Sequence, residues 1–410
     1  MNFTITLPDL QKALLKTIPA LPRKSTIPVL EHLHFSAKDN VLSIIASDQD
    51  MTIMTKVDVT CEEEGEVLVP GKRFNDIIRA LGNTGAMEFK SDNESFNIQI
   101  QTSFGKYKMK GIDPNEYLTL PELFKSEKPN IIFDKTTEIV QPVGESVVDD
   151  AAVEEVEEKP PVIYLRKDEI CYLTEKTSYA VSNDEYRPAM NGVLFQFRGS
   201  YINSVATDSY RLVKASISPE QQNLPDEMDI IFSARTADLL KKSENDVIIS
   251  FVVTRSKITH ARFDTENTVI VSRIIDEKFP PYETVIPINN NLYIRLSKSE
   301  LLNTIKRISI FANQINHQIK MKLTTDDIII GAEDDDTASS GFESINGEYN
   351  GEPMEIGFNH KLLEELIQYI DTGDDDRIRF EFSEHSKAVL IKADDDSDSL
   401  LMIIMPSRTK

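Results

Sequence analysis

The residue types that most often carry catalysis or bind metals are scattered in this sequence. One close histidine pair, His32 and His34, would lie on one face of an alternating strand. Two imidazoles on one face can begin a metal site, but two surface histidines are the commoner reason for this spacing. Cys61 and Cys171 are lone thiols with no paired spacing, which favours a reducing compartment, the cytoplasm, over a disulfide framework.

Three runs of carboxylates, at 333–336, 374–376 and 394–396, fall at expected turns between strands. A hard cation needs carboxylates that converge from spaced positions, so we interpret these runs as solvated hairpin tips. Gly71 and Lys72 lack the other residues of a phosphate-binding loop, and no nucleophile motif occurs. We therefore expect no catalytic residue, no metal and no cofactor. Paired catalytic carboxylates remain an alternative that one sequence leaves open.

The net charge of the chain is strongly negative and unevenly distributed. The 410 residues, enough for two or three domains, hold 45 Lys and Arg against 68 Asp and Glu, a net charge of −23. This charge disfavours membranes and, at first reading, nucleic acid. The longest apolar run, 400–405, is too short to span a bilayer, and the N-terminus shows no signal peptide.

The expected helices differ from the rest of the chain in charge. Six helical segments together carry +8, and they are 9–24, 71–81, 166–181, 233–243, 297–307 and 359–370. If these helices share one surface, that surface is a cationic track that contacts phosphates without reading bases. The alternative for any one helix is a solvated charged face.

A threefold pattern organises the sequence. Helices with one apolar face are predicted at 9–16, 167–174 and 299–306, and a second helix follows each of them after 64, 67 and 61 residues. Period-two segments with short polar joints lie between and after the helices, among them 29–35, 96–100, 193–197 and 320–323. The pattern predicts an α+β fold of three repeats, each with two helices on antiparallel sheets.

The repeats give predicted domain boundaries of 1–133, 161–290 and 291–410. Residues 134–160 break the pattern, with nine acids, two lysines and low hydrophobicity. Such a composition is typical of a linker, and a solvated spacer is a simpler interpretation than an acidic regulatory arm.

Several short motifs, taken in order, resemble the bacterial DNA polymerase III β subunit family of sliding clamps. They are 26–30 (TIPVL), 69–74 (VPGKRF), 187–192 (RPAMNG), 206–212 (ATDSYRL), 279–285 (FPPYETV), 354–359 (MEIGFN) and 405–408 (MPSR). The resemblance covers the whole chain except 134–160. It implies a closed ring of two identical three-domain chains, joined head to tail around duplex DNA, with helices lining the hole and no catalytic activity.

The resemblance also implies partners and site residues. The partners would be double-stranded DNA without sequence preference, the replicative DNA polymerase catalytic subunit, the clamp loader, other proteins with clamp-binding motifs and a second copy of the chain, but no membrane. A pocket between the second and third domains would bind an extended peptide that ends in apolar residues. Its expected residues are Met190, Thr207, Ser209, Tyr210, Arg211, Leu212, Pro280, Val285, Asn359, Met405, Pro406, Ser407 and Arg408.

Two further surfaces follow from the same resemblance. The expected DNA-facing cations are Lys24, Arg73 and Arg235, then Lys12, Lys72 and Lys306, and the expected dimer edge uses Ile78 and Tyr107 against Ile310 and Phe311. Tyr210 and Ser407 depart from the family pattern, where His and an apolar residue are common, so the peptide preference is in question. A ring-less adaptor with the same pocket and an unrecognised enzyme are the alternative hypotheses.

Overall fold

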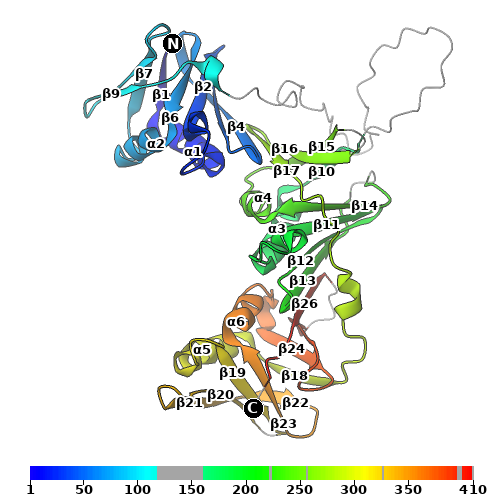
Figure 1. Ribbon diagram of the computed structural model, residues 1–410. Helices are drawn as coiled ribbons and strands as arrows, with labels where there is room; N and C mark the ends of the chain where they lie inside the picture. Colours follow the sequence, from blue (N-terminus) through cyan, green and yellow to red (C-terminus); the bar gives the residue numbers. More distant parts are fainter. Residues whose placement is uncertain (118–159, 221–223, 255–256, 326, 395–398, 409–410) are drawn as a thin grey trace, which may run out of the picture. The chain divides into compact units, whose positions relative to one another are not determined.

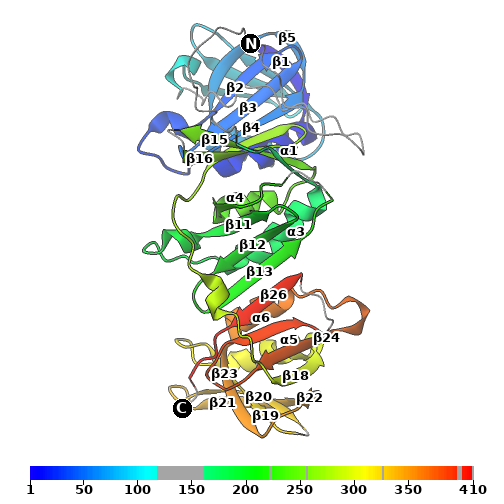
Figure 2. The ribbon, with the colours of Figure 1, turned by 90° about the vertical axis from the view of Figure 1, so that its right-hand side faces the viewer.

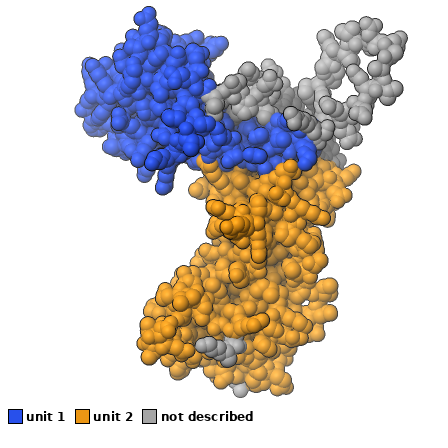
Figure 3. Space-filling model, viewed as in Figure 1, with its two compact units in different colours: residues 1–167, 244–274 blue, residues 168–243, 275–410 orange. Residues whose placement is uncertain are grey.

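The computed structural model describes residues 1–117, 160–220, 224–254, 257–325, 327–394 and 399–408. Its contacts divide the chain into two units (Figure 3). Unit 1 comprises Met1–Lys167 and Glu244–Ile274, and unit 2 comprises Asp168–Ser243 and Ile275–Lys410. The chain therefore passes from one unit to the other three times.

Unit 1 is built on two antiparallel sheets (Figure 1). Its strands are β1 Asn2–Thr6, β2 His32–Lys38, β3 Val41–Ser47, β4 Met51–Asp58, β5 Thr60–Glu63, β6 Gly65–Pro70, β7 Ala86–Ser91, β8 Asn97–Thr102, β9 Lys106–Lys110, β10 Ile163–Leu165, β15 Val247–Thr254, β16 Lys257–Asp264 and β17 Thr268–Arg273. One sheet has the order β5-β1-β7-β8-β9, and the other has the order β10-β15-β16-β17-β4-β3-β2-β6.

Unit 2 also holds two antiparallel sheets (Figure 2). Its strands are β11 Gly192–Arg198, β12 Tyr201–Thr207, β13 Arg211–Ile217, β14 Met228–Ser233, β18 Leu292–Ser297, β19 Gln318–Leu323, β20 Ile328–Asp334, β21 Ser339–Ile345, β22 Gly347–Tyr349, β23 Met354–Asn359, β24 Arg377–Phe382, β25 Val389–Ala393 and β26 Leu400–Ile404. The nine-stranded sheet has the order β14-β11-β12-β13-β26-β25-β24-β18-β22, and the four-stranded sheet has the order β21-β20-β19-β23.

The described chain forms six α-helices, two in each predicted repeat. They are α1 Leu7–Thr17, α2 Gly71–Ala80, α3 Lys167–Thr177, α4 Ala234–Leu240, α5 Lys298–Ile308 and α6 His360–Gln368. Four of them begin at a side-chain cap on a backbone N–H: Thr6, Ser233, Ser297 and Asn359. The predicted pattern of two helices and antiparallel strands in each repeat is therefore confirmed.

The sheets cross the predicted domain boundaries. Strand β17 of the second repeat pairs with β4 of the first, from Thr268 opposite Thr55 to Ser272 opposite Met51. Strand β13, also of the second repeat, pairs with β26, with Arg211 opposite Ile404. Each junction continues a hydrogen-bond ladder that would otherwise end at an exposed strand edge. This is why the two units divide the second repeat between them.

The helices pack their apolar faces onto these sheets. In unit 1, helix α2 contributes Phe74 to an aromatic cluster in which the rings of Phe35 and Phe74 lie 5.3 Å apart and Phe3 stacks on Phe89 at 4.9 Å. All four rings are buried. In unit 2, α5 contacts β20 and β21, and α6 contacts β23 and β26. Buried aromatic rings of this size supply much of the apolar area that a core needs.

Several helices end earlier than the sequence predicts. Helix α1 stops at Thr17, where the expected segment 9–24 meets Pro19 and Pro22, because a proline lacks the N–H that a helix interior requires. The helices thereby lose five of the expected cations, Arg23, Lys24, Arg166, Lys241 and Lys242, and their net charge is +3 instead of +8. Five of the eight net positive charges expected on helices thus lie in the segments that flank them.

Two other predicted segments are the strand 29–35 and the linker 134–160. The predicted strand 29–35 begins as a 3₁₀ turn, Pro28–Glu31, and only then becomes β2. The predicted linker 134–160 lies outside the described residues except for its last position. Among the described residues, no helix is long and apolar enough to cross a membrane.

Candidate functional site

A groove of about 710 Å³ in unit 2 is the main candidate site. It is lined by the segment after α3, the turn between β12 and β13, and the first two turns of α6. We call it the Arg211 groove, and its lining residues are Tyr179, Val181, Ser182, Asn183, Asp184, Arg187, Asp208, Ser209, Tyr210, Arg211, Lys361, Leu362 and Glu365.

The turn between β12 and β13 is shaped by a single aspartate. Oδ1 of Asp208 accepts hydrogen bonds from the backbone N–H groups of Tyr210 and Arg211, both at 2.9 Å. Ser209, between Asp208 and Tyr210, has a φ of +76°, a left-handed conformation that residues other than glycine adopt at a cost. The turn holds Tyr210 outward, with 66% of its surface exposed.

Arg211 forms the floor of the groove and is only 6% exposed. Its guanidinium pairs with Asp208 at 3.1 Å and with Glu365 of α6, and it donates a 2.8 Å hydrogen bond to the carbonyl oxygen of Tyr179. The guanidinium also lies over the Tyr179 ring, 5.3 Å from its centroid, and that ring stacks on Tyr369 at 4.1 Å. Burial raises the pKa of Tyr179, so its hydroxyl stays neutral.

The apolar residues expected at the pocket pack beside this floor. Leu212 is buried in a cluster with Leu194, Phe279, Tyr282 and Ile403. Met190 is also buried, and its sulfur lies 3.9 Å from Oγ of Ser209. Pro280 and Val285 belong to the segment that brings Phe279 and Tyr282 into the cluster, and Val285 remains half exposed.

The C-terminal residues run along the edge strand β23 of the four-stranded sheet. The Met405 N–H donates to the Tyr210 carbonyl at 2.8 Å, and the Ser407 N–H donates to the Gly357 carbonyl at 2.9 Å. Nε2 of Gln318 donates to Oγ of Ser407 and to the Arg408 carbonyl oxygen, both at 2.9 Å. The segment from Met405 through Pro406 to Arg408 is therefore held from both sides.

The expected pocket residues form three neighbouring sets and not one lining. The Arg211 groove itself contains Ser209, Tyr210 and Arg211, and Thr207 supports them through a 2.7 Å hydrogen bond to the Arg211 carbonyl. Asn359 acts at one end of the groove as the cap of α6. All thirteen lie in unit 2, and their role in binding remains a prediction.

Sequence reasoning missed several lining residues of the groove. Lys361, Leu362 and Glu365 lie on a helix that was predicted, but the sequence pattern assigned none of them to a site. Tyr179 gave no such signal, because its contacts with Arg211 and Tyr369 join segments far apart in sequence.

Most of the expected DNA-facing cations are exposed: Lys24, Lys72, Arg73, Arg235 and Lys306. Lys12 is exposed too, but it pairs with Glu244 at 3.2 Å, and Lys16 pairs with the same carboxylate at 3.1 Å. These two lysines lower the pKa of Glu244 through hydrogen bonds to its charged form. Part of the positive charge of α1 is therefore neutralised within unit 1.

The expected dimer residues differ in exposure. Ile310 is 75% exposed, Phe311 is partly exposed and Tyr107 is half-buried. Ile78, in contrast, is completely buried within unit 1 and presents no surface in the single chain, so its place at a dimer edge stays an untested prediction. An i, i+4 pattern on α2 turns Phe74 and Ile78 toward the core together.

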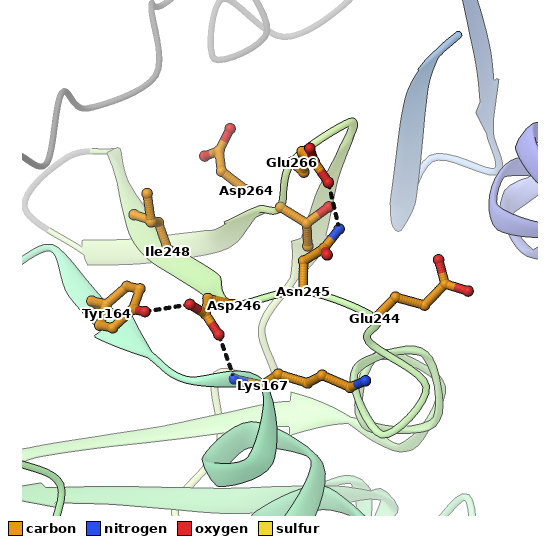
Figure 4. Close-up of a pocket in the computed structure, with 9 residues that line it drawn as sticks. Tyr164, Lys167, Glu244, Asn245, Asp246, Ile248, Asp264 and Glu266 are labelled. Atoms are coloured by element: carbon orange, nitrogen blue, oxygen red, sulfur yellow. Dashed lines mark hydrogen bonds between the residues drawn. The ribbon is translucent and has the colours of Figure 1, made fainter. Parts of the chain in front are cut away.

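A second pocket, of about 390 Å³, lies in unit 1 and is acidic (Figure 4). Its residues are Tyr164, Lys167, Glu244, Asn245, Asp246, Ile248, Asp264, Thr265 and Glu266. The carboxylates already have partners: Asp246 accepts from the Lys167 N–H at 2.8 Å, and Glu266 accepts from Asn245 at 3.2 Å. Asp264, also in the lining, forms a buried bidentate pair with Arg262.

The residues that suggested metal chemistry have structural contacts instead. His34 is buried with Nε2 3.5 Å from Glu66, so its interpretation as a surface histidine is wrong, and Nδ1 of His32 lies 3.3 Å from the Pro28 carbonyl oxygen. Asp376, expected at a solvated tip, hydrogen-bonds to Ser297 and Ser299 at the start of α5. The described part of the chain contains no group of three metal-ligating side chains.

The chain matches known proteins along nearly its whole length. Models of the DNA polymerase III beta subunit match in order: the N-terminal domain over residues 1–121, the central domain over 164–281 and the C-terminal domain over 283–408. The beta sliding clamps of Vibrio cholerae and Staphylococcus epidermidis are each 25% identical to it, with both chains fully covered.

Solved structures show the same fold. A DnaN sliding clamp from Pseudomonas aeruginosa bound to griselimycin has a TM-score of 0.82 at 23% identity, and a DNA polymerase sliding clamp from Bacillus subtilis has a TM-score of 0.81 at 22% identity. Each comparison covers all of both chains. The likeness therefore extends over every predicted repeat.

Proposed function

Because the chain belongs to the DNA polymerase III beta subunit family of sliding clamps, which are non-catalytic processivity factors, we propose that it encircles duplex DNA and tethers replication proteins to it. The observation that carries this proposal is the ordered match of three domain models to three helix-and-sheet repeats. A ring of this kind does no bond chemistry, and its working place is the bacterial cytoplasm.

The contact with DNA in this proposal is electrostatic and weak. Exposed cations at helix ends and in the turns after them, such as Lys24, Arg73 and Lys306, meet phosphates while the rest of a chain of −23 repels DNA. Contacts of this kind carry no sequence information and are screened by salt, so a closed ring can slide. Retention then depends on topology more than on affinity.

The test is retention on circular and linear DNA. After loading by a clamp loader, we expect the protein to stay on nicked circular DNA during gel filtration and to leave once the circle is cut. A matched sample on DNA cut before loading provides the control. Equal loss from circular and linear DNA would contradict encirclement.

Ring closure requires two chains, and each chain offers two suitable edges. Strand β9 ends the five-stranded sheet of unit 1 and bears Lys106, Lys108 and Lys110, while β21 ends the four-stranded sheet of unit 2. Ile310 and Phe311 lie close to β21, because a Cβ added at Gly341 would meet the Phe311 ring at 2.6 Å. We propose that β9 of one chain meets β21 of its partner, head to tail.

Tethering in this proposal uses the Arg211 groove and the apolar cluster beside it. An extended peptide from the polymerase catalytic subunit, the clamp loader or another partner would place apolar side chains near Met190, Leu212 and Val285 and run past Tyr210. Removal of residues 405–410 should abolish binding of such peptides and leave the dimer intact. Unchanged peptide affinity would contradict this assignment.

A further inference from the structure

The charged residues that line the Arg211 groove differ in whether they form ion pairs. Three acids and three cations line it. Arg211 pairs with both Asp208 and Glu365, and Arg187 pairs with Asp184 at 3.6 Å. Each of the three acids therefore has an arginine partner, although the two arginines carry one charge fewer than the three acids, and the third cation, Lys361, forms no ion pair with any of them.

Lys361 has no carboxylate within ion-pair distance among the described residues. Its Nζ lies 3.1 Å from Nε2 of His317, which is a neutral acceptor only while the imidazole is unprotonated. The lysine is exposed on the first turn of α6, where the N-terminal end of the helix adds further positive potential. Lys361 thus places at this end of the groove a positive charge that no carboxylate of the described residues pairs with, although the chain as a whole is strongly negative.

An apolar surface lies directly beside this charge. Leu362 follows Lys361 on the helix and is half-buried in the wall of the groove, with Val181 also in the lining. A peptide in the groove can therefore place an apolar side chain on Leu362 and an adjacent side chain near Nζ of Lys361. A carboxylate of the ligand can pair with this lysine without breaking any ion pair within the chain.

We propose that Lys361 selects partner peptides that carry an aspartate or glutamate beside their apolar residues. This inference rests on the proposed function, since it concerns which peptides the tethering groove prefers. The occupant is an extended acidic-apolar segment of a partner protein. Arg187 and Arg211 do not contribute to the selection, because their charges are already compensated within the chain.

The test compares three synthetic octapeptides that end in two apolar residues and differ at one upstream position, which carries Asp, Asn or Lys. To choose this position, Asp is placed at each peptide position in turn, and the affinity of each peptide for the full-length protein is measured. Fluorescence anisotropy should show that the Asp peptide binds about fivefold more tightly than the Asn peptide at low salt. Lys361→Gln should remove this difference and leave the Asn peptide unchanged, and Lys361→Glu should favour the Lys peptide.

Lys322→Gln is the matched control, because Lys322 is another exposed lysine of unit 2 that does not line the groove. It should keep the full preference for Asp, and circular dichroism should show all variants folded. An equal affinity for the Asp and Asn peptides at every position, or equal losses for both in Lys361→Gln, would overturn the inference and leave the proposed function standing. Failure of every peptide to bind would overturn the tethering proposal itself.

Discussion

Arg211 and Glu365 form an ion pair that joins strand β13 to helix α6 across the floor of the groove. Arg211 is buried, and Glu365 is half exposed. The pair therefore connects the second predicted repeat to the third at the site proposed for partner binding. Its two members should contribute very differently to stability.

Replacement of Glu365 by Gln should lower the unfolding free energy by about 1 kcal/mol, because Arg211 keeps its contact with Asp208. Arg211→Met should lower it by about 3 kcal/mol, since Asp208 and the Tyr179 carbonyl lose a charged partner in a poorly solvated place. Urea unfolding followed by circular dichroism measures both values, because the chain has no Trp for fluorescence. Arg187→Gln, at an exposed pair, is the control, and equal effects at Arg187 and Arg211 would contradict this account.

The sequence predicted the repeated architecture well because its signals are local. Caps such as Ser297 and Asn359, and the apolar faces that follow them, mark the start of four of the six helices of the described chain. Helix ends were predicted less accurately. Helix α1, for example, ends at Thr17, two residues before Pro19. The pairing of β17 with β4 lay beyond any local pattern, because it joins strands from different repeats.

Local signals in the sequence also identified only the contiguous part of the groove. The turn Thr207–Leu212 is a contiguous motif and was identified, and it does form the rim and floor of the groove. The stacking of Tyr179 on Tyr369 depends on segments 190 residues apart, and nothing in either segment alone indicates it. The burial of Ile78 could not be foreseen from the resemblance, because a resemblance gives a role to a position without giving its exposure.

Glu244 is predicted to restrain the contact of α1 with DNA. It holds both Lys12 and Lys16, so Glu244→Gln should release two cations toward phosphates. We expect stronger binding to short duplex DNA and a salt dependence steeper by about 2 in the slope of log K against log salt, because two cations gain phosphate contacts. Glu266→Gln, on the rim of the same acidic pocket, is the control and should change neither value. Unchanged binding in Glu244→Gln would show that α1 does not face DNA.

The buried His34 should make unit 1 less stable in acid. Burial lowers its pKa below the ordinary 6.5, and Glu66 only partly opposes this effect. The unfolded chain therefore takes up the proton first as the pH falls, so this contribution to stability is complete above about pH 6.5 and is lost progressively below it, down to the pKa of the folded state.

Urea unfolding at several pH values measures this effect. Replacing His34 by Gln should reduce the pH dependence below about pH 6.5, by at most about 1.4 kcal/mol per pH unit. His260 and His360, whose pKa values burial also lowers, keep part of the dependence. The exposed His385 serves as the control position. An identical pH profile in His34→Gln and the parent chain would contradict the assignment.

Ile310 is predicted to hold two chains together at the β21 edge. It is 75% exposed beside Phe311, and a charge in the centre of an apolar interface would have to lose its water without gaining a partner. Ile310→Asp should therefore convert the dimer to a monomer in analytical ultracentrifugation and abolish retention on circular DNA. Ile288→Asp is the matched control, because Ile288 is even more exposed but lies in the segment before β18, away from this edge. If Ile310→Asp stays dimeric, or if Ile288→Asp dissociates equally, the ring does not close at β21.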